Sequence, residues 1–229
     1  MSIVIEMVSD LACPWCWLGL RRLQSARAQC ADVDLQILFR PYELDPTIPA
    51  EGTDYKSYMK ARMGGTGSAE EDAKTSRFRA MRTALEEFGA AEGIPFDFEG
   101  MNWRPNTLNA HRLVRWAQGQ DKGAAAKEAL FKAYFSEHRD IGDHGVLASI
   151  GEEIGLERDI IEKLLASDAD IDAVRQEEAV FQQMGVRGVP TYIGNRSIAV
   201  QGAESAEKLA KFIRTLAAQV PQERPLGTA

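Results

Sequence analysis

The 229-residue chain is long for one small domain and short for three, which favours one large domain or a core that carries an insertion. Hydrophobic residues make up 45% of the chain and charged residues 27%, a composition typical of an ordinary soluble protein, which excludes disorder, collagen and coiled coil. The 27 Lys and Arg residues against 34 Asp and Glu residues give a net charge of −7, which would repel a phosphate backbone, so we expect no nucleic acid partner.

The N-terminal residues predict neither a secretory signal nor a membrane anchor. The early apolar run at 3–8 is interrupted by Glu6, and the first basic residue is Arg21. Three cysteines are too few for the disulfide framework of a small secreted domain. We therefore expect a cytoplasmic protein whose cysteines are catalytic, metal-binding or inert.

The beginning of the chain alternates between strand and helix patterns. Residues 3–8 are nearly continuous in apolar side chains, as in a strand that is covered on both faces. Residues 14–30 predict a helix, because Pro14 suits the first helical position and apolar residues follow at helical spacing. Residues 33–39 alternate and predict a second strand. This order is a βαβ unit, in which we expect parallel strands.

A long helical region follows a stretch at 45–54 that is rich in Pro, Gly and Thr. Amphipathic spacing predicts helices around residues 78–88, 110–117 and 126–134. The Gly64–Ser68 segment breaks this pattern and is predicted to be a mobile loop. About half of the chain is therefore expected to be helical filling.

The C-terminal part returns to strand patterns at 189–193 and 197–200, and a last amphipathic helix is predicted from Ser205. The order βαβ, helices, ββα indicates a core that is split by the helices. The predicted division is a discontinuous core at residues 1–50 and 176–220, an inserted helical domain at 51–175 and a polar tail at 221–229.

The strongest chemical signal is Cys13-Pro14-Trp15-Cys16, which directly follows a predicted strand and opens a helix. Unsatisfied N–H groups and the dipole at a helix N-terminus favour a negative charge, so we expect the Cys13 thiol to ionise more readily than a free one. Cys13 is then the attacking thiolate. Cys16, one helical turn further in, is expected to attack the mixed disulfide and release the partner.

Two other interpretations of the cysteine pair are a zinc site and a pair of structural cysteines. Tetrahedral zinc needs two further ligands, and the chain has no second cysteine pair. The run at 138–144 contains metal-like residues, but Asp143 is better explained as the cap of a following helix. We expect no metal. Cys30 is expected to be a buried and inert thiol.

The chain resembles the DsbA family of thioredoxin-fold proteins in its strand, C-P-W-C motif, helical insertion and the Gly188-Val189-Pro190-Thr191 sequence before a late strand. It is most similar to the FrnE-like branch, whose relatives include 2-hydroxychromene-2-carboxylate isomerases and kappa-class glutathione transferases. The resemblance covers nearly the whole chain and implies an α/β, thioredoxin-like fold with a large inserted α-helical domain. Supporting matches are Arg40-Pro41-Tyr42-Glu43-Leu44, Asn106-Thr107, Ala110-His111-Arg112 and Gly202-Ala203-Glu204.

The resemblance also implies where a substrate binds. In that family the proline that matches Pro190 is cis and faces the dithiol, where the backbone of Val189 can pair with an extended peptide or with glutathione. A trans proline at a strand start is the alternative. Trp15, Asn106 and Glu204 are further candidates for substrate binding. Asn106 also suits a capping role, and the sequence around Glu204 differs from that of the transferases.

Asp10, His111 and Arg112 are weaker candidates. Asp10 is close enough in sequence to the dithiol to perturb Cys13 or to carry a proton, although it equally suits a turn that caps the loop. His111 and Arg112 resemble the helix that faces the active site in this family, although salt-bridge roles are the simpler interpretation.

The sequence therefore predicts a thiol-disulfide oxidoreductase, because it keeps both cysteines where the isomerases and transferases carry serine at the first position. We expect no required cofactor, with glutathione as a reductant or co-substrate, protein thiols or disulfides as partners, and no membrane association. Dimers occur among the relatives, which makes a homodimer an expectation by analogy. Two alternatives remain, a glutathione-dependent isomerase or transferase acting on a small aromatic compound, and a chaperone-like binding module without catalysis.

Overall fold

The N-terminal βαβ unit forms as predicted in a computed structural model that describes residues 2–63 and 69–219. β1 (Ile3–Ser9) and β2 (Leu35–Pro41) are parallel, and α1 (Pro14–Gln29) connects them. The predicted loop at 64–68 and the predicted tail at 221–229 lie outside the described residues.

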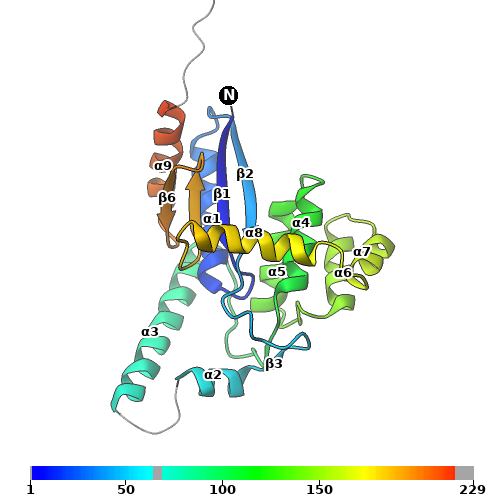
Figure 1. The fold of residues 1–229 in the computed structure, drawn as a ribbon. Coiled ribbons are helices and arrows are strands. Elements are labelled where there is room, and N and C mark those ends of the chain that lie inside the picture. The colour runs from blue at the N-terminus through cyan, green and yellow to red at the C-terminus, as the bar shows by residue number, and fades with distance from the viewer. Residues whose placement is uncertain (1, 64–68, 220–229) are drawn as a thin grey trace, which may run out of the picture.

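A four-stranded mixed sheet in the order β2-β1-β5-β6 forms the centre of the molecule (Figure 1). β5 (Thr191–Gly194) pairs antiparallel with both β1 and β6 (Ile198–Gln201). α1 and α9 (Ala206–Gln219) pack together against one face, and α8 (Ile171–Gln183) crosses the other. β1 is therefore covered on both faces, which explains its nearly continuous apolar sequence.

The chain between β2 and α8 is mainly helical, with a short antiparallel pair of β3 (Thr53–Asp54) and β4 (Trp103–Arg104). The predicted domain boundary at residue 176 falls inside α8, so this helix spans the end of the insertion and the return to the core. The helices of this part are α2 (Tyr55–Met63), α3 (Ala69–Ala91), α4 (Leu108–Gln118), α5 (Gly123–Phe135), α6 (His144–Glu153) and α7 (Arg158–Leu165).

An aromatic cluster fixes the helical part against the helix that carries the dithiol. Trp17 on α1 is fully buried, and its ring centroid lies 6.1 Å from Phe131 and 6.2 Å from Phe135 on α5. Its indole N–H donates to Glu128 at 3.0 Å. Burying a side chain of this size contributes about 5 kcal/mol. Because α1 and α5 share this core, the position of α5 relative to the dithiol is set by packing.

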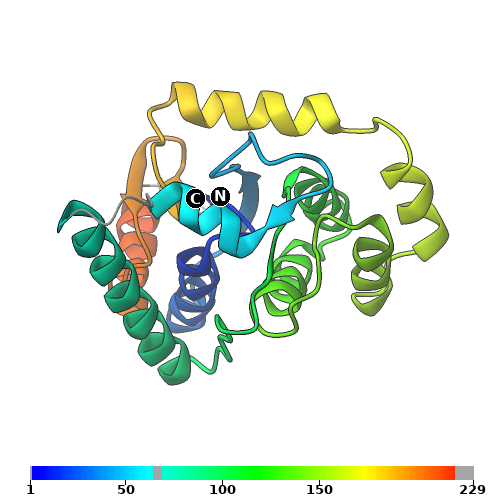
Figure 2. The same ribbon diagram turned by 90° about the horizontal axis from the view of Figure 1, so that it is seen from below.

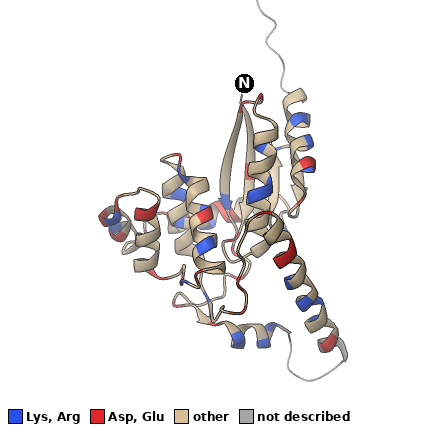
Figure 3. Ribbon diagram, turned by 180° about the vertical axis from the view of Figure 1, so that it is seen from behind, with Lys and Arg blue, Asp and Glu red and all other residues tan. Residues whose placement is uncertain are grey.

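α2 and α3 lie below the sheet in Figure 1, and α2 differs from α3 in its charge. Figure 2 shows α2 in the foreground, between α3 on one side and the α4 and α5 pair on the other. α2 carries Lys56, Lys60 and Arg62 and no acidic residue, as Figure 3 shows.

Across residues 2–63 and 69–219, none of the helices combines the length and the apolar character that crossing a membrane requires.

Candidate functional site

Cys13 and Cys16 lie where β1 passes into α1. Cys13 is the N-cap residue, with φ −108° and ψ 111°, and Pro14 occupies the first helical position. The Cys13 carbonyl accepts a hydrogen bond from the Cys16 N–H at 3.0 Å, which places the two side chains one turn apart. Both thiols are free. The helix therefore begins directly after the first cysteine, which is its N-cap residue.

The second cysteine is the more enclosed of the two. Cys16 is 0% exposed, whereas Cys13 is 4% exposed and borders a cavity. Burial raises the pKa of the Cys16 thiol well above its ordinary value, and the hydrogen bond and charge of Cys13 raise it further. The nearby Lys127 cation acts in the opposite direction. Cys16 is therefore a protonated thiol in the reduced protein at neutral pH.

The loop before β5 reaches the dithiol from the opposite side. Cys13 Sγ lies 3.8 Å from the Val189 carbonyl oxygen, within hydrogen-bond range for sulfur. The Val189–Pro190 peptide bond is cis, which confirms the sequence prediction. A Cβ atom at Gly19 of α1 would lie 2.9 Å from Pro190 Cγ and 2.3 Å from the Tyr192 hydroxyl. The absence of a side chain at residue 19 therefore lets α1 approach the start of β5.

Asp10 is fully buried in the loop that leads to the dithiol. Its carboxylate accepts hydrogen bonds from the backbone N–H groups of Ala12 at 3.1 Å and Leu44 at 2.8 Å. Burial alone would raise the pKa of Asp10, but His111, 3.8 Å away, and the Arg104 guanidinium outweigh it and lower the pKa to about 2. Asp10 is thus an anion that shapes the loop, the turn role that the sequence left open.

Two more buried carboxylates lie near Asp10. The Glu43 N–H donates to Glu178 Oε1 at 2.9 Å. Burial raises the pKa of both side chains, and the negative charges of Glu178 and Asp10 help to raise the pKa of Glu43 to about 7. Glu43 therefore changes its charge near neutral pH, a property that its sequence position did not indicate.

Replacement of Glu43 by glutamine is expected to stabilise the protein at pH 8 and to have little effect at pH 4. Folding raises the pKa from 4.5 to about 7, so the folded protein binds more protons than the unfolded chain between these values. Below pH 4.5 Glu43 is protonated in both states and costs the folded protein nothing. As the pH rises through 7, Glu43 ionises in the folded protein, and the protein has then lost about 3 kcal/mol of stability.

Urea denaturation of the Glu43→Gln variant at both pH values measures this difference. Glu51→Gln, at an exposed position in the following loop, is the matched control and should change stability at neither pH. A gain for Glu43→Gln that is the same at pH 4 and pH 8 would show that the carboxylate is not the cause.

Lys127 of α5 is a buried cation near the dithiol. Its side chain is 0% exposed, and Nζ has no hydrogen-bond partner within the described part of the chain. Nζ lies 5.8 Å from the Phe39 ring centroid and 5.4 Å from that of Phe131. Burial lowers the pKa of Lys127 to about 8, although the electrostatic interactions with Cys16 and Asp10 act against this.

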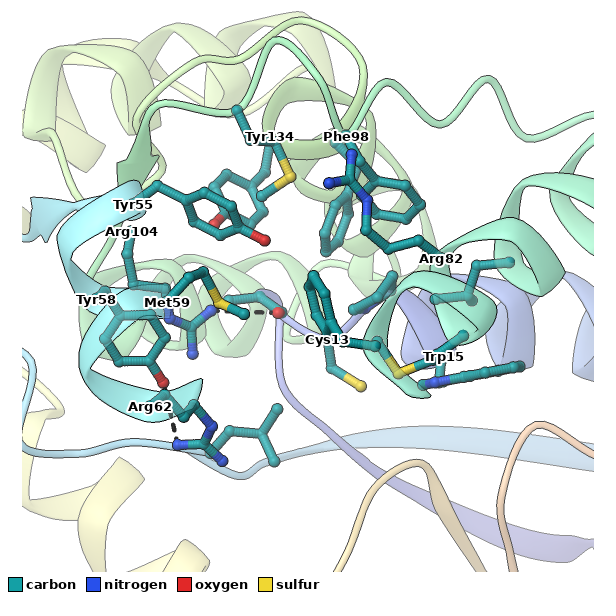
Figure 4. Close-up of a pocket in the computed structure, with 18 of the residues that line it drawn as sticks. Cys13, Trp15, Tyr55, Tyr58, Met59, Arg62, Arg82, Phe98, Arg104 and Tyr134 are labelled. Carbon is teal, nitrogen blue, oxygen red and sulfur yellow. Dashed lines mark hydrogen bonds between the residues drawn. The ribbon is translucent and has the colours of Figure 1, made fainter. Parts of the chain in front are cut away.

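A cavity of about 440 Å³ opens beside Cys13, between the start of α1 and helices α2, α3 and α5 (Figure 4). Its size is in the range of small-molecule binding sites. Trp15 borders it, and the Trp15 ring lies 6.4 Å from that of Phe88. Apolar side chains form most of the wall, among them Met59, Phe78, Met81, Leu85, Phe98 and Phe135.

Two sequence-predicted substrate residues, Asn106 and Glu204, do not line this cavity. The Asn106 amide donates to the Ile48 carbonyl at 2.8 Å and accepts from the Leu108 N–H at 3.0 Å. Glu204 forms an ion pair with Lys208 at 2.9 Å. Both side chains are therefore engaged elsewhere, and their part in substrate binding stays a prediction.

His111 and Arg112, the residues of α4 that resemble the family, have different neighbours in the structure. His111 lies near Asp10, whereas the fully buried Arg112 donates to the carbonyls of Leu164, Ser167 and Ala169. Arg112 therefore ties α4 to the segment after α7, a structural role.

The metal-like run at 138–144 is accounted for by local hydrogen bonds. Asp143 caps α6 by accepting from the Val146 N–H at 2.8 Å, which confirms the predicted cap. The His144 ring is hydrogen bonded to Asn109 at 3.0 Å. Within residues 2–63 and 69–219, no group of three or more His, Cys, Asp and Glu side chains is arranged to hold a metal ion.

The sequence interpretation missed the cavity and its polar residues, among them Tyr55, Arg82 and Arg104. The only signal was the amphipathic face at Phe78, Met81 and Leu85, which predicted a helix that packs on a core. Part of that face borders the cavity instead.

Residues 4–214 match the DSBA-like thioredoxin domain. A probable DsbA oxidoreductase from Streptomyces coelicolor superimposes with a TM-score of 0.83 and 25% identity, over 98% of this chain and 94% of that chain. A 2-hydroxychromene-2-carboxylate isomerase gives a TM-score of 0.69 and 19% identity, over 94% of this chain and 97% of that one. The cytosolic disulfide reductase DsbM from Pseudomonas aeruginosa, solved with GSH, gives 0.63 and 18%, over 94% and 99%. These matches confirm the predicted fold class.

Proposed function

Because the chain belongs to the family of DSBA-like thioredoxin domains, we propose that it is a thiol-disulfide oxidoreductase that acts through Cys13-Pro14-Trp15-Cys16. The observation that carries this proposal is the position of the two thiols. Cys13 is the N-cap of α1 and borders a cavity, while the protonated thiol of Cys16 lies one turn behind it. A nucleophile that borders a cavity, backed by an enclosed second thiol, is what a two-step exchange requires.

In the reducing direction, the Cys13 thiolate attacks one sulfur of a substrate disulfide. A bond between Cys13 and the substrate forms, the substrate S–S bond breaks, and the leaving thiolate takes up a proton. Cys16 then loses its proton and attacks the Cys13 sulfur, so that the second substrate thiol leaves and a Cys13–Cys16 disulfide forms. Two electrons have passed to the substrate. A low-molecular-weight thiol such as glutathione reduces the protein again in the proposed cytoplasmic setting, and the same steps in reverse oxidise a substrate.

The surrounding groups have separate parts in this proposal. The dipole at the N-terminus of α1 favours a negative charge at residue 13. The Val189 carbonyl, 3.8 Å from Cys13 Sγ, and the peptide edge at Pro190 position the substrate chain. Trp15 forms part of the substrate wall. Lys127 supports the charge that develops on Cys16.

A Cys16→Ala variant is expected to accumulate mixed disulfides, since Cys13 can still attack but no second thiol releases the partner. Mass spectrometry of the non-reduced variant identifies the partner as a protein or as glutathione. The Cys13→Ala/Cys16→Ala double variant is the control and should trap nothing. If Cys16→Ala traps no more than this control, the proposed exchange is wrong.

A glutathione-dependent isomerase is the second candidate function, and the apolar cavity beside Cys13 favours it. An isomerase needs a pocket for its small substrate and one nucleophilic or thiol-holding group, but no second thiol. Isomerisation of 2-hydroxychromene-2-carboxylate in the presence of glutathione tests it. Activity that survives Cys16→Ala but not Cys13→Ala would support the isomerase, and complete inactivity of the unaltered protein would exclude this substrate.

A further inference from the structure

The first thiol of the pair is reached through the cavity rather than from an open surface. Cys13 is 4% exposed, yet it borders the cavity of about 440 Å³. Figure 4 shows the cavity enclosed by Tyr55 and Tyr58 from α2 on one side and by Trp15 and Phe98 on the other. A cavity of this volume is in the range that holds a small molecule.

The wall of the cavity is suited to an apolar body. Apart from its tyrosines and basic residues, its side chains are aliphatic, aromatic or sulfur-containing. Met59, Met81 and Met101 contribute flexible thioethers, which adapt to the outline of a bound ring or chain. Contact with such a wall is favourable in proportion to the apolar area that leaves water.

The polar groups of the cavity favour a negative charge. Arg62, Lys74, Arg82 and Arg104 line it, and its described lining includes no Asp or Glu. Arg62 is 59% exposed and lies 4.0 Å from Asp45, so it belongs to the rim. A carboxylate on a ligand would therefore meet positive side chains and no negative side chain of the described lining.

Arg104 and Arg82 differ in the partners that their guanidinium groups already have within the protein. Arg104 is 6% exposed, one of its Nη atoms donates to the Ala12 carbonyl at 3.2 Å, and Asp10 faces it. Its Nε atom has no hydrogen-bond partner in the described structure. The Arg82 guanidinium lies 5.1 Å from the Phe98 ring centroid and has no carboxylate partner within the described ranges. Arg82 therefore leaves donors free for an anion, and the buried Arg104 adds a positive charge beside it.

We propose that the cavity binds a small thiol or disulfide that combines an apolar, preferably aromatic, body with a carboxylate, and that Arg82 and Arg104 recognise this carboxylate. The inference rests on the proposed function, because it assigns a substrate class to the same two cysteines. Guanidinium groups hold carboxylates through paired, charge-assisted hydrogen bonds. The apolar body lies along the methionine and aromatic wall, with its sulfur toward Cys13.

The test compares two aromatic disulfides in stopped-flow reactions with the reduced full-length protein. 5,5′-Dithiobis(2-nitrobenzoate) carries carboxylates, whereas 2,2′-dithiodipyridine is neutral. Arg82→Met is expected to slow the reaction with the anionic disulfide about tenfold, the loss typical of one charge-assisted hydrogen bond. The reaction with the neutral disulfide should change less than about twofold, because the apolar wall is intact.

Two further variants separate recognition from general charge and folding effects. Arg79→Met is the matched control, because Arg79 is exposed on the same helix, one turn earlier, and does not line the cavity. It should leave both rates unchanged. Arg82→Lys keeps the charge but loses the forked geometry of the guanidinium group. It should slow the reaction with the anionic disulfide by less than Arg82→Met does. Equal slowing by Arg79→Met and Arg82→Met would overturn the proposal.

A binding measurement with ligands that cannot exchange sulfur distinguishes this inference from the proposed function. Calorimetric titration of 2-naphthoate against 2-naphthamide should show preference for the acid, and Arg82→Met should remove it. If both disulfides react but the variant changes their rates equally, the substrate class is wrong and the exchange function stands. If neither disulfide reacts while the preference for naphthoate depends on Arg82, the anion site is supported and the exchange function is wrong.

Discussion

Replacement of Cys13 by serine is expected to reduce the rate of disulfide exchange by about a thousandfold or more. A hydroxyl at this position cannot supply the thiolate that attacks sulfur, and losing a nucleophile has effects of this size or larger. The N-terminus of α1 favours an anion at residue 13, but it cannot ionise an alcohol to a useful extent at neutral pH. The measurement is the rate of thiol release from a model disulfide under single-turnover conditions.

Cys30→Ser is the matched control for this experiment. Cys30 ends the same helix, is 1% exposed, and its thiol lies 3.6 Å from the Ala210 carbonyl, to which a serine hydroxyl can also donate. Exchange should be unchanged in this variant. Equal losses in the Cys13 and Cys30 variants would show that the effect is structural. If Cys13 and Cys16 can both be replaced without loss of the cellular role, the non-catalytic binding module is favoured.

Replacement of Lys127 by methionine is expected to stabilise the protein by about 3 kcal/mol at pH 7, because folding lowers the pKa of this lysine from 10.5 to about 8. Below pH 8 the side chain is charged in both states, so the folded state carries the full cost of the buried cation. This cost falls as the pH rises from 8 through 10.5, where the lysine becomes neutral in the unfolded chain too. The gain measured by urea denaturation should therefore be near zero above pH 10.5.

The same variant is expected to slow the second step of exchange. The Lys127 cation lowers the pKa of Cys16, so its removal leaves less Cys16 thiolate to attack the mixed disulfide. The thiolate population falls as the pKa of Cys16 rises, so the mixed disulfide with Cys13 should persist longer in quenched-flow samples of the variant. A more stable protein with slower release would identify Lys127 as a positioning residue.

Lys132→Met provides the comparison on the same helix. Lys132 is exposed, and solvent screens its ion pair with Glu137 at 2.9 Å, so its replacement should change stability little and leave the release step unchanged. If Lys127→Met stabilises the protein but leaves the release rate unchanged, the buried cation does not support Cys16. If it destabilises the protein equally at pH 7 and pH 10.5, the loss comes from packing rather than from charge.

The arrangement of the two cysteines themselves follows from neighbours in the sequence. A strand, a short loop and a helix that opens on proline place Cys13 and Cys16 one turn apart, because helix initiation and helical periodicity are local properties. The later strands are also local patterns, although β5 begins at Thr191 rather than Val189. Proline has no N–H to donate to a sheet, so the residues before Thr191 stay outside the ladder.

The cavity and the buried charges required the tertiary structure. Tyr55, Arg82 and Arg104 come from three separate elements, and a helix face that borders a cavity has the same apolar spacing as one that packs on a core. Lys127 is buried because α5 packs on β2 and α1, which brings Phe39 and Cys16 to its side chain. The sequence by itself thus determined the fold and the position of the two thiols for which we propose the exchange. Only long-range packing decided what surrounds the thiols, because burial and charge pairing depend on residues that are distant along the chain.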